Sequence, residues 1–73
     1  MSGVAAIGEG SRIRGFALAG VTVVAAPDET AARAAWEALD PDVGLVILTP
    51  EAARALGSAL WANTRRLWVE LPG

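Results

Sequence analysis

One glycine-rich segment of this sequence could hold a nucleotide, but it lacks residues that this chemistry requires. Gly8-Glu9-Gly10 has the spacing of the first two glycines in a dinucleotide-binding loop, where the backbone approaches a pyrophosphate. Ile13 stands where the third glycine should permit close packing of helix on strand, and no Gly-Lys-Ser/Thr follows as in a P-loop. We therefore interpret the segment as a turn, with an anion held at the following helix N-terminus as the alternative.

Carboxylate and hydroxyl side chains offer no better basis for catalysis. Asp40 and Asp42 flank Pro41 in an expected loop, and paired carboxylates at this place are typical of turns rather than of acid and base catalysis. Thr49 and Ser58 have no histidine or lysine to activate them, because the chain contains neither residue type and no cysteine. The sequence predicts no catalytic residue, no cofactor and no metal site.

The composition favours one small domain over residues 1–73, with 53% hydrophobic residues and a net charge of -2. Six arginines and eight acidic residues are interleaved along the chain, so neither a nucleic-acid-binding stripe nor a basic membrane patch is expected. Met1–Ile7 lacks the basic start of a signal peptide, and no apolar run reaches the ~18 residues of a membrane span. We expect a cytoplasmic protein without membrane insertion.

Apolar runs and turn residues together predict the fold. Four runs rich in aliphatic residues indicate strands over 4–7, 22–25, 45–48 and 67–71, separated by three helical segments. The runs are continuous rather than alternating, as in strands covered on both faces. The sequence therefore predicts an α/β fold: a small four-stranded parallel sheet flanked by helices, in the receiver or flavodoxin-like order 2-1-3-4.

Each expected helix is bounded by residues that favour helix ends. The predicted N-caps, whose side chains accept a hydrogen bond from the first helical turn, are Ser11, Asp28 and Thr49. Gly20 stands where the first helix ends, because glycine readily takes the positive φ of a helix C-terminus. The helices are expected over 11–19, 30–39 and from Pro50 to residue 60 or 61, the last with a break at 57–58.

A phosphorylated receiver domain shares this layout but needs other residues. Its chemistry requires an acidic cluster after the first strand and an aspartate at the end of the third. This chain has Glu9 alone at the first place and Thr49 at the second. Signalling by phosphorylation is therefore excluded, and a degenerate receiver-like signalling or protein-interaction module stays as an alternative function.

The three tryptophans divide into one core candidate and two open cases. Trp36 shares a helical face with Ala32, Ala35 and Leu39, which predicts that it packs in the core. Trp61 lies at a helix end and Trp68 in the last strand, where either the core or a protein interface could use an indole ring.

Four segments, taken in order, resemble the F subunit of the V-type/A-type ATP synthases. Segment 4–8 is similar to the opening strand and turn, and 15–21 (GFALAGV) is similar to a signature of glycine, phenylalanine, any residue, leucine, alanine, glycine and an aliphatic residue. Segment 42–51 is similar to the third strand and helix start, and 69–73 is similar to a strand that ends in Leu or Ile, then Pro, then Gly or Ser. The matching residues that carry backbone constraints are Gly8, Gly15, Gly20 and Pro72.

The resemblance implies a non-catalytic component of the central stalk, or rotor, of a proton- or sodium-translocating ATPase. Such proteins bind the coiled-coil D subunit, lie peripheral to the membrane and help couple ATP synthesis or hydrolysis to ion transport. Family members often add a C-terminal helical tail, and this sequence stops at Gly73, where the tail would begin. The expected fold therefore lacks that tail, either as a short variant or as a truncated product.

The same segment provides candidates for the partner interface. Phe16 and Leu18 are two residues apart, so a regular helix cannot turn both side chains toward the sheet. We predict that Phe16, Leu18 and Trp61 offer apolar contact area to a partner. The alternative is a short helix that packs locally and stops at Gly20.

Overall fold

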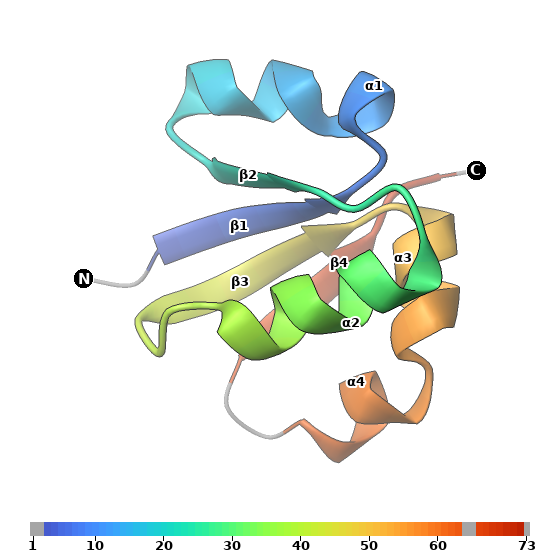
Figure 1. Cartoon of the computed structure of the whole chain (residues 1–73). Helices are drawn as coiled ribbons and strands as arrows, with labels where there is room; N and C mark the ends of the chain where they lie inside the picture. Colours follow the sequence, from blue (N-terminus) through green and yellow to red (C-terminus); the bar gives the residue numbers. More distant parts are fainter. Residues whose placement is uncertain (1–2, 64–65, 73) are drawn as a thin grey trace.

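Four parallel strands form one sheet in the order β2-β1-β3-β4 in the computed structural model, which describes residues 3–63 and 66–72 (Figure 1). The strands are β1 (Gly3–Gly8), β2 (Thr22–Ala25), β3 (Val43–Leu48) and β4 (Leu67–Glu70). The predicted fold class and strand order are confirmed. β3 begins two residues earlier than predicted because Gly3 pairs with Val43 across an irregularity in the ladder.

Helices cover the sheet unequally. They are α1 (Gly10–Ile13), the 3₁₀ helix η1 (Arg14–Ala19), α2 (Glu29–Ala38), α3 (Pro50–Leu56) and α4 (Ser58–Ala62). Figure 1 shows α1 and η1 on one side of the sheet, beside β2 and β1, and α2, α3 and α4 on the other. None of the helices in the described part of the chain has the length and apolar character that crossing a membrane requires.

Side-chain caps fix the starts of α2 and α3 as predicted. Asp28 Oδ1 accepts a hydrogen bond of 2.8 Å from the Ala31 amide, and Thr49 Oγ1 accepts one of 3.2 Å from the Ala52 amide. Gly20 ends η1 with a φ of 81°. The predicted break in the third helix is confirmed at Gly57, whose φ of 49° separates α3 from α4.

The prediction for the first helix was wrong in two respects. Ser11 is not its N-cap, because the helix begins at Gly10, directly after Glu9. Ser11 Oγ instead donates a hydrogen bond of 3.1 Å to Glu9 Oε1. Only four residues are α-helical before the chain tightens into η1. A 3₁₀ helix rises about 2.0 Å per residue against 1.5 Å for an α-helix, so the ten residues 10–19 span more of the ~20 Å return path along the sheet.

The larger core lies between the sheet and the layer of α2, α3 and α4. It is built from aliphatic strand residues, among them Ile7, Val46 and Leu48, and from alanines that let the helices approach closely. The alanines are Ala32, Ala35, Ala52, Ala53 and Ala55. Trp36 packs against this core as predicted, but it is only half-buried.

Candidate interaction surface

The side chains considered for catalysis serve the fold. Asp40 Oδ1 accepts a 2.9 Å hydrogen bond from the Asp42 amide, which closes the turn before β3. Thr49 is completely buried, and its hydroxyl caps α3. In the ranges 3–63 and 66–72, no three histidine, cysteine or acidic side chains gather as a metal site would require. Asp40 and Thr49 therefore bind backbone amides that close a turn and start a helix.

Gly8 and Glu9 do not form a phosphate cradle. A Cβ on Gly8 would overlap the side chain of Thr49, coming within 2.6 Å of its Oγ1 and closer still to its Cγ2. Gly8 thus permits close packing between β1 and the start of α3. The Glu9 carboxylate stands at the start of α1, where it would repel a phosphate.

The end of β4 is tied to α1. Arg12 Nη2 donates a 3.0 Å hydrogen bond to the carbonyl oxygen of Pro72, sixty residues further along the chain. The amide of Leu71 donates to the Leu48 carbonyl at 2.8 Å, which holds the same segment against β3. Arg12 therefore links α1 to the segment that follows the edge strand β4.

An apolar strip of β3 and β4 lies on the α1 side of the sheet. We call it the open sheet face, and it consists of Leu45, Ile47, Leu67 and Val69. Leu45 pairs with Leu67 and Ile47 with Val69, while the residues between them, Val46 and Trp68, point to the opposite core. The solvent-exposed fractions are 74% for Leu67 and 48% for Val69.

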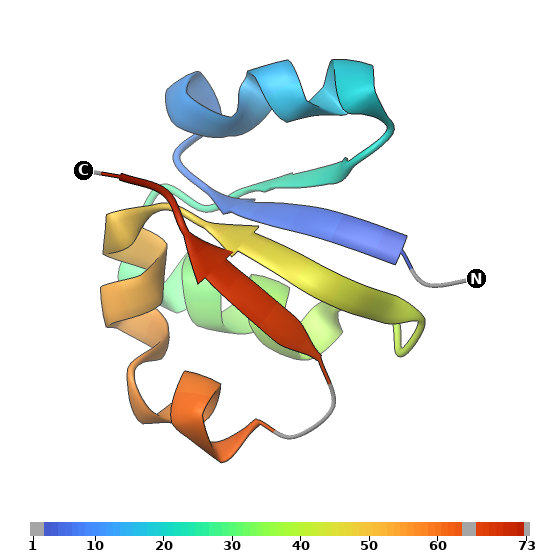
Figure 2. The ribbon, with the colours of Figure 1, turned by 180° about the vertical axis from the view of Figure 1, so that it is seen from behind.

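Figure 2 shows this side of the sheet from behind, with α1 and η1 beside β2 and β1. No helix of the described residues stands in front of β3 and β4 in this view. Phe16 is half-buried, and Ile13, three residues earlier, is completely buried. The side chain of Leu18 lies outside the part of the structure that is described. The interface prediction for both residues stays a prediction.

Trp61 is the most exposed of the large hydrophobic residues described, at 80%. Its ring meets Trp68 edge to face, with centroids 5.6 Å apart and planes at 84°, a favoured arrangement of aromatic pairs. Trp68 is half-buried against the core. The pair places Trp61 beside β4, where its exposed indole adds apolar surface next to the sheet edge.

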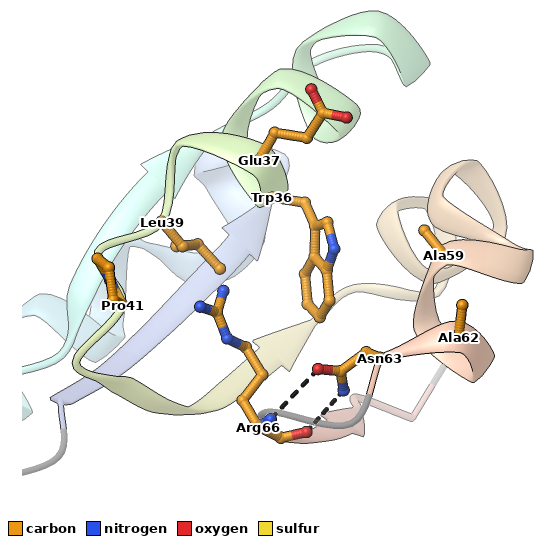
Figure 3. Close-up of a pocket in the computed structure, with 8 residues that line it drawn as sticks. All are labelled: Trp36, Glu37, Leu39, Pro41, Ala59, Ala62, Asn63 and Arg66. Atoms are coloured by element: carbon orange, nitrogen blue, oxygen red, sulfur yellow. Dashed lines mark hydrogen bonds between the residues drawn. The ribbon is translucent and has the colours of Figure 1, made fainter.

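A hollow of about 530 Å³ lies between α2, α4 and the start of β4 (Figure 3). The Cζ atom of Arg66 stands 5.5 Å from the centroid of the Trp36 ring, within the range of a cation–π contact. The other lining residues are Glu37, Leu39, Pro41, Ala59, Ala62 and Asn63. The described lining combines the Arg66 cation, the Glu37 carboxylate and the Trp36 ring with both polar and apolar walls.

Sequence reasoning missed Leu67, Val69 and Arg66 as surface candidates. The continuous apolar run of the last strand predicted burial on both faces, and an edge strand resembles a central one in such a run. The predicted strand order could have identified Leu67 and Val69, because it puts β4 at the edge of the sheet. Arg66 gave no signal of its own, because its position over Trp36 depends on how the segment between α4 and β4 lies beside α2.

Comparison with known proteins agrees with the resemblance noted in the sequence. The family model described as ATP synthase (F/14-kDa) subunit matches residues 4–72. No curated protein and no solved structure gave a significant match. Since the matched range runs from β1 through the residues that follow β4, this chain belongs to the family of ATP synthase (F/14-kDa) subunits.

Proposed function

We propose that this protein is a non-catalytic component of the central stalk of a V/A-type proton- or sodium-translocating ATP synthase. In this role it binds the coiled-coil D subunit on the cytoplasmic side of the membrane, and it helps couple ATP synthesis or hydrolysis to ion transport. The observation that carries the proposal is the family match over residues 4–72. The exposed apolar surface around β4 supports binding to a protein partner.

The open sheet face fits a helix of such a partner. Neighbouring strands lie about 4.8 Å apart, so β3 and β4 together offer a strip about 10 Å wide. This is close to the diameter of one α-helix with its side chains. The four aliphatic side chains of the face would pack against the apolar stripe of the incoming helix, as α2 and α3 do on the other side.

The layer of α1 and η1 provides one wall for this helix. Arg12 of α1 bonds to the carbonyl oxygen of Pro72 after β4. Residues three apart lie on one side of an α-helix or a 3₁₀ helix, so Gly15 at the start of η1 lies on the same wall. A Cβ on Gly15 would meet no atom within 4 Å. The absence of a side chain at Gly15 therefore leaves room for close approach of a partner.

Co-purification with the D subunit of the same synthase tests the proposal. We expect the wild-type chain to form a complex and Leu67→Asp to lose it, because a carboxylate on the open sheet face cannot be buried against an apolar helix at low cost. Leu67 is exposed, so the variant should keep its melting temperature. Thr30→Asp is the matched control: it adds the same charge at an exposed place in the first turn of α2, and binding should persist.

Two outcomes would contradict the proposal. If the wild-type chain does not bind the D subunit under conditions in which other members of the family do, the stalk role is wrong. If Leu67→Asp binds as tightly as the wild-type chain, the open sheet face is not the docking surface.

A further inference from the structure

We propose that the hollow between α2 and α4 receives an Asp or Glu side chain of the partner protein, which pairs with the Arg66 guanidinium over the Trp36 ring. The site rests on the proposed function for its partner, and it lies on the side of the sheet opposite the open sheet face. A partner that contacts both the hollow and the open sheet face would therefore bind on both sides of the sheet at the β4 edge.

The position of Arg66 is fixed at its backbone. Asn63 Nδ2 donates to the Arg66 carbonyl at 2.7 Å, and the Arg66 amide donates to Asn63 Oδ1 at 3.2 Å. This double contact sets where the chain enters β4 after α4. Figure 3 shows the Arg66 side chain extending from that point between Leu39 and Trp36.

The Arg66 guanidinium has no carboxylate partner among the described residues. The ion pairs found there join Glu29 to Arg33 and Glu51 to Arg54. Glu37 lines the same hollow, but it forms no ion pair with Arg66, and Figure 3 shows its carboxylate pointing away from the guanidinium. The planar donor groups of Arg66 thus line the hollow without an ion pair to any described residue, and their geometry matches a carboxylate bound through both oxygens.

The walls of the hollow favour a side chain carried by a protein over a free anion. Leu39, Pro41, Ala59 and Ala62 present apolar atoms around the cation and provide no further donor for an isolated anion. An ion pair that stays in water contributes little, whereas a partner that covers the hollow would exclude water from the pair. The apolar walls would then contact the methylene groups and backbone that carry the carboxylate.

Affinity for the D subunit, measured with the full chain, tests the site. We expect Arg66→Ala to weaken binding about 30-fold or more, because it removes one member of a covered ion pair. The affinity of Arg66→Lys should lie between those of the wild-type chain and Arg66→Ala, since lysine keeps the charge but cannot bind a carboxylate through two parallel hydrogen bonds. Arg54→Ala is the matched control: its side chain is exposed on α3, and we expect less than about a twofold change.

Salt dependence and charge exchange provide independent readouts. The wild-type complex should weaken more steeply with ionic strength than the Arg66→Ala complex. An acidic residue of the partner whose change to Arg restores binding of Arg66→Glu would identify the side chain that enters the hollow.

Three results would overturn the inference. Unchanged affinity of Arg66→Ala, in a complex that Leu67→Asp still abolishes, would exclude the site and leave the proposed function standing. No binding of the wild-type chain would reject both. Saturable quenching of Trp36 fluorescence by submillimolar inorganic phosphate, lost in Arg66→Ala, would mean that the hollow holds a free anion instead. Trp36→Phe identifies which of the three tryptophans reports that binding.

Discussion

The two faces of the sheet carry similar aliphatic side chains but have different neighbours. On one face, Val46 and Leu48 of β3 are completely buried beneath α2 and α3. On the other, Leu45 and Ile47 of the same strand are half-buried, and their neighbour Leu67 on β4 is largely exposed. Side-chain type therefore does not distinguish the faces. The difference arises from the helices, which cover β3 on one face, whereas on the other face α1 and η1 lie over β1 and β2.

This contrast separates residues that hold the domain together from residues that are free to bind. A buried leucine stabilises the fold through the apolar surface it removes from water. An exposed leucine contributes little to the fold and keeps its apolar surface available to a partner. Paired substitutions, one at a buried and one at an exposed position, measure how strongly each kind of residue contributes to stability.

The largest expected effect compares two leucines. We expect Leu48→Ala to lower the free energy of unfolding by about 2–5 kcal/mol, since it leaves a cavity in the core. Leu67→Ala should change it by less than about 0.5 kcal/mol, because its side chain is mostly in water. Urea denaturation followed by circular dichroism measures both. Equal losses of unfolding free energy in the two variants would show that Leu67 is buried in solution, either by a second copy of the protein or by a polypeptide segment over the open sheet face.

The second pair compares two glycines. Gly8→Ala should destabilise the protein by about 1–3 kcal/mol, because the new methyl group overlaps Thr49. Gly15→Ala meets no neighbouring atom, and alanine is the better helix former, so we expect no loss or a gain of up to about 1 kcal/mol. Thermal unfolding distinguishes the two.

A double variant checks the reason given for Gly8. In a Thr49→Ala background, the cost of Gly8→Ala should fall, because the two closest Thr49 atoms are gone. An unchanged cost would point to the backbone rather than to this contact. Reduced binding of Gly15→Ala to the D subunit would in turn support close approach at η1.

The smallest expected effect compares two hydroxyl groups at helix starts. Thr49→Ala should cost about 0.5–2 kcal/mol, since it removes the cap of α3. Ser11→Ala should cost only a few tenths of a kcal/mol, because Ser11 bonds to an exposed Glu9 and caps nothing. Equal costs in chemical denaturation would mean that α1 depends on Ser11 after all.

Sequence patterns predicted most of the elements because local signals agree with the fold. Asp28, Thr49, Gly20 and Gly57 mark helix ends through hydrogen bonds or φ values that depend on near neighbours. The N-cap prediction for Ser11 was wrong because a serine after a strand fits the sequence pattern of an N-cap, whereas its hydroxyl here bonds to Glu9 and not to a helix amide. The resemblance to the family also depended on local segments, since it needed only the order of a few motifs, and the family model then matched residues 4–72.

The candidate surfaces were less predictable. Trp61 was open between core and interface, and its 80% exposure follows from the turn at Gly57 that sends α4 away from α3. Leu67 and Val69 looked like the residues of a covered strand. Arg66 meets Trp36 across thirty residues of chain, a contact that no local spacing encodes.

The sequence by itself determined the α/β class, the strand order, the caps of α2 and α3 and the family, because periodicity, capping and motif order depend on residues close in the chain. Only the tertiary structure decided which face of β4 is open, why Gly8 must lack a side chain, and that Arg66 stands over Trp36 without an acidic partner among the described residues. These features depend on which helices lie over which strands, and that arrangement brings together residues that are distant in the sequence.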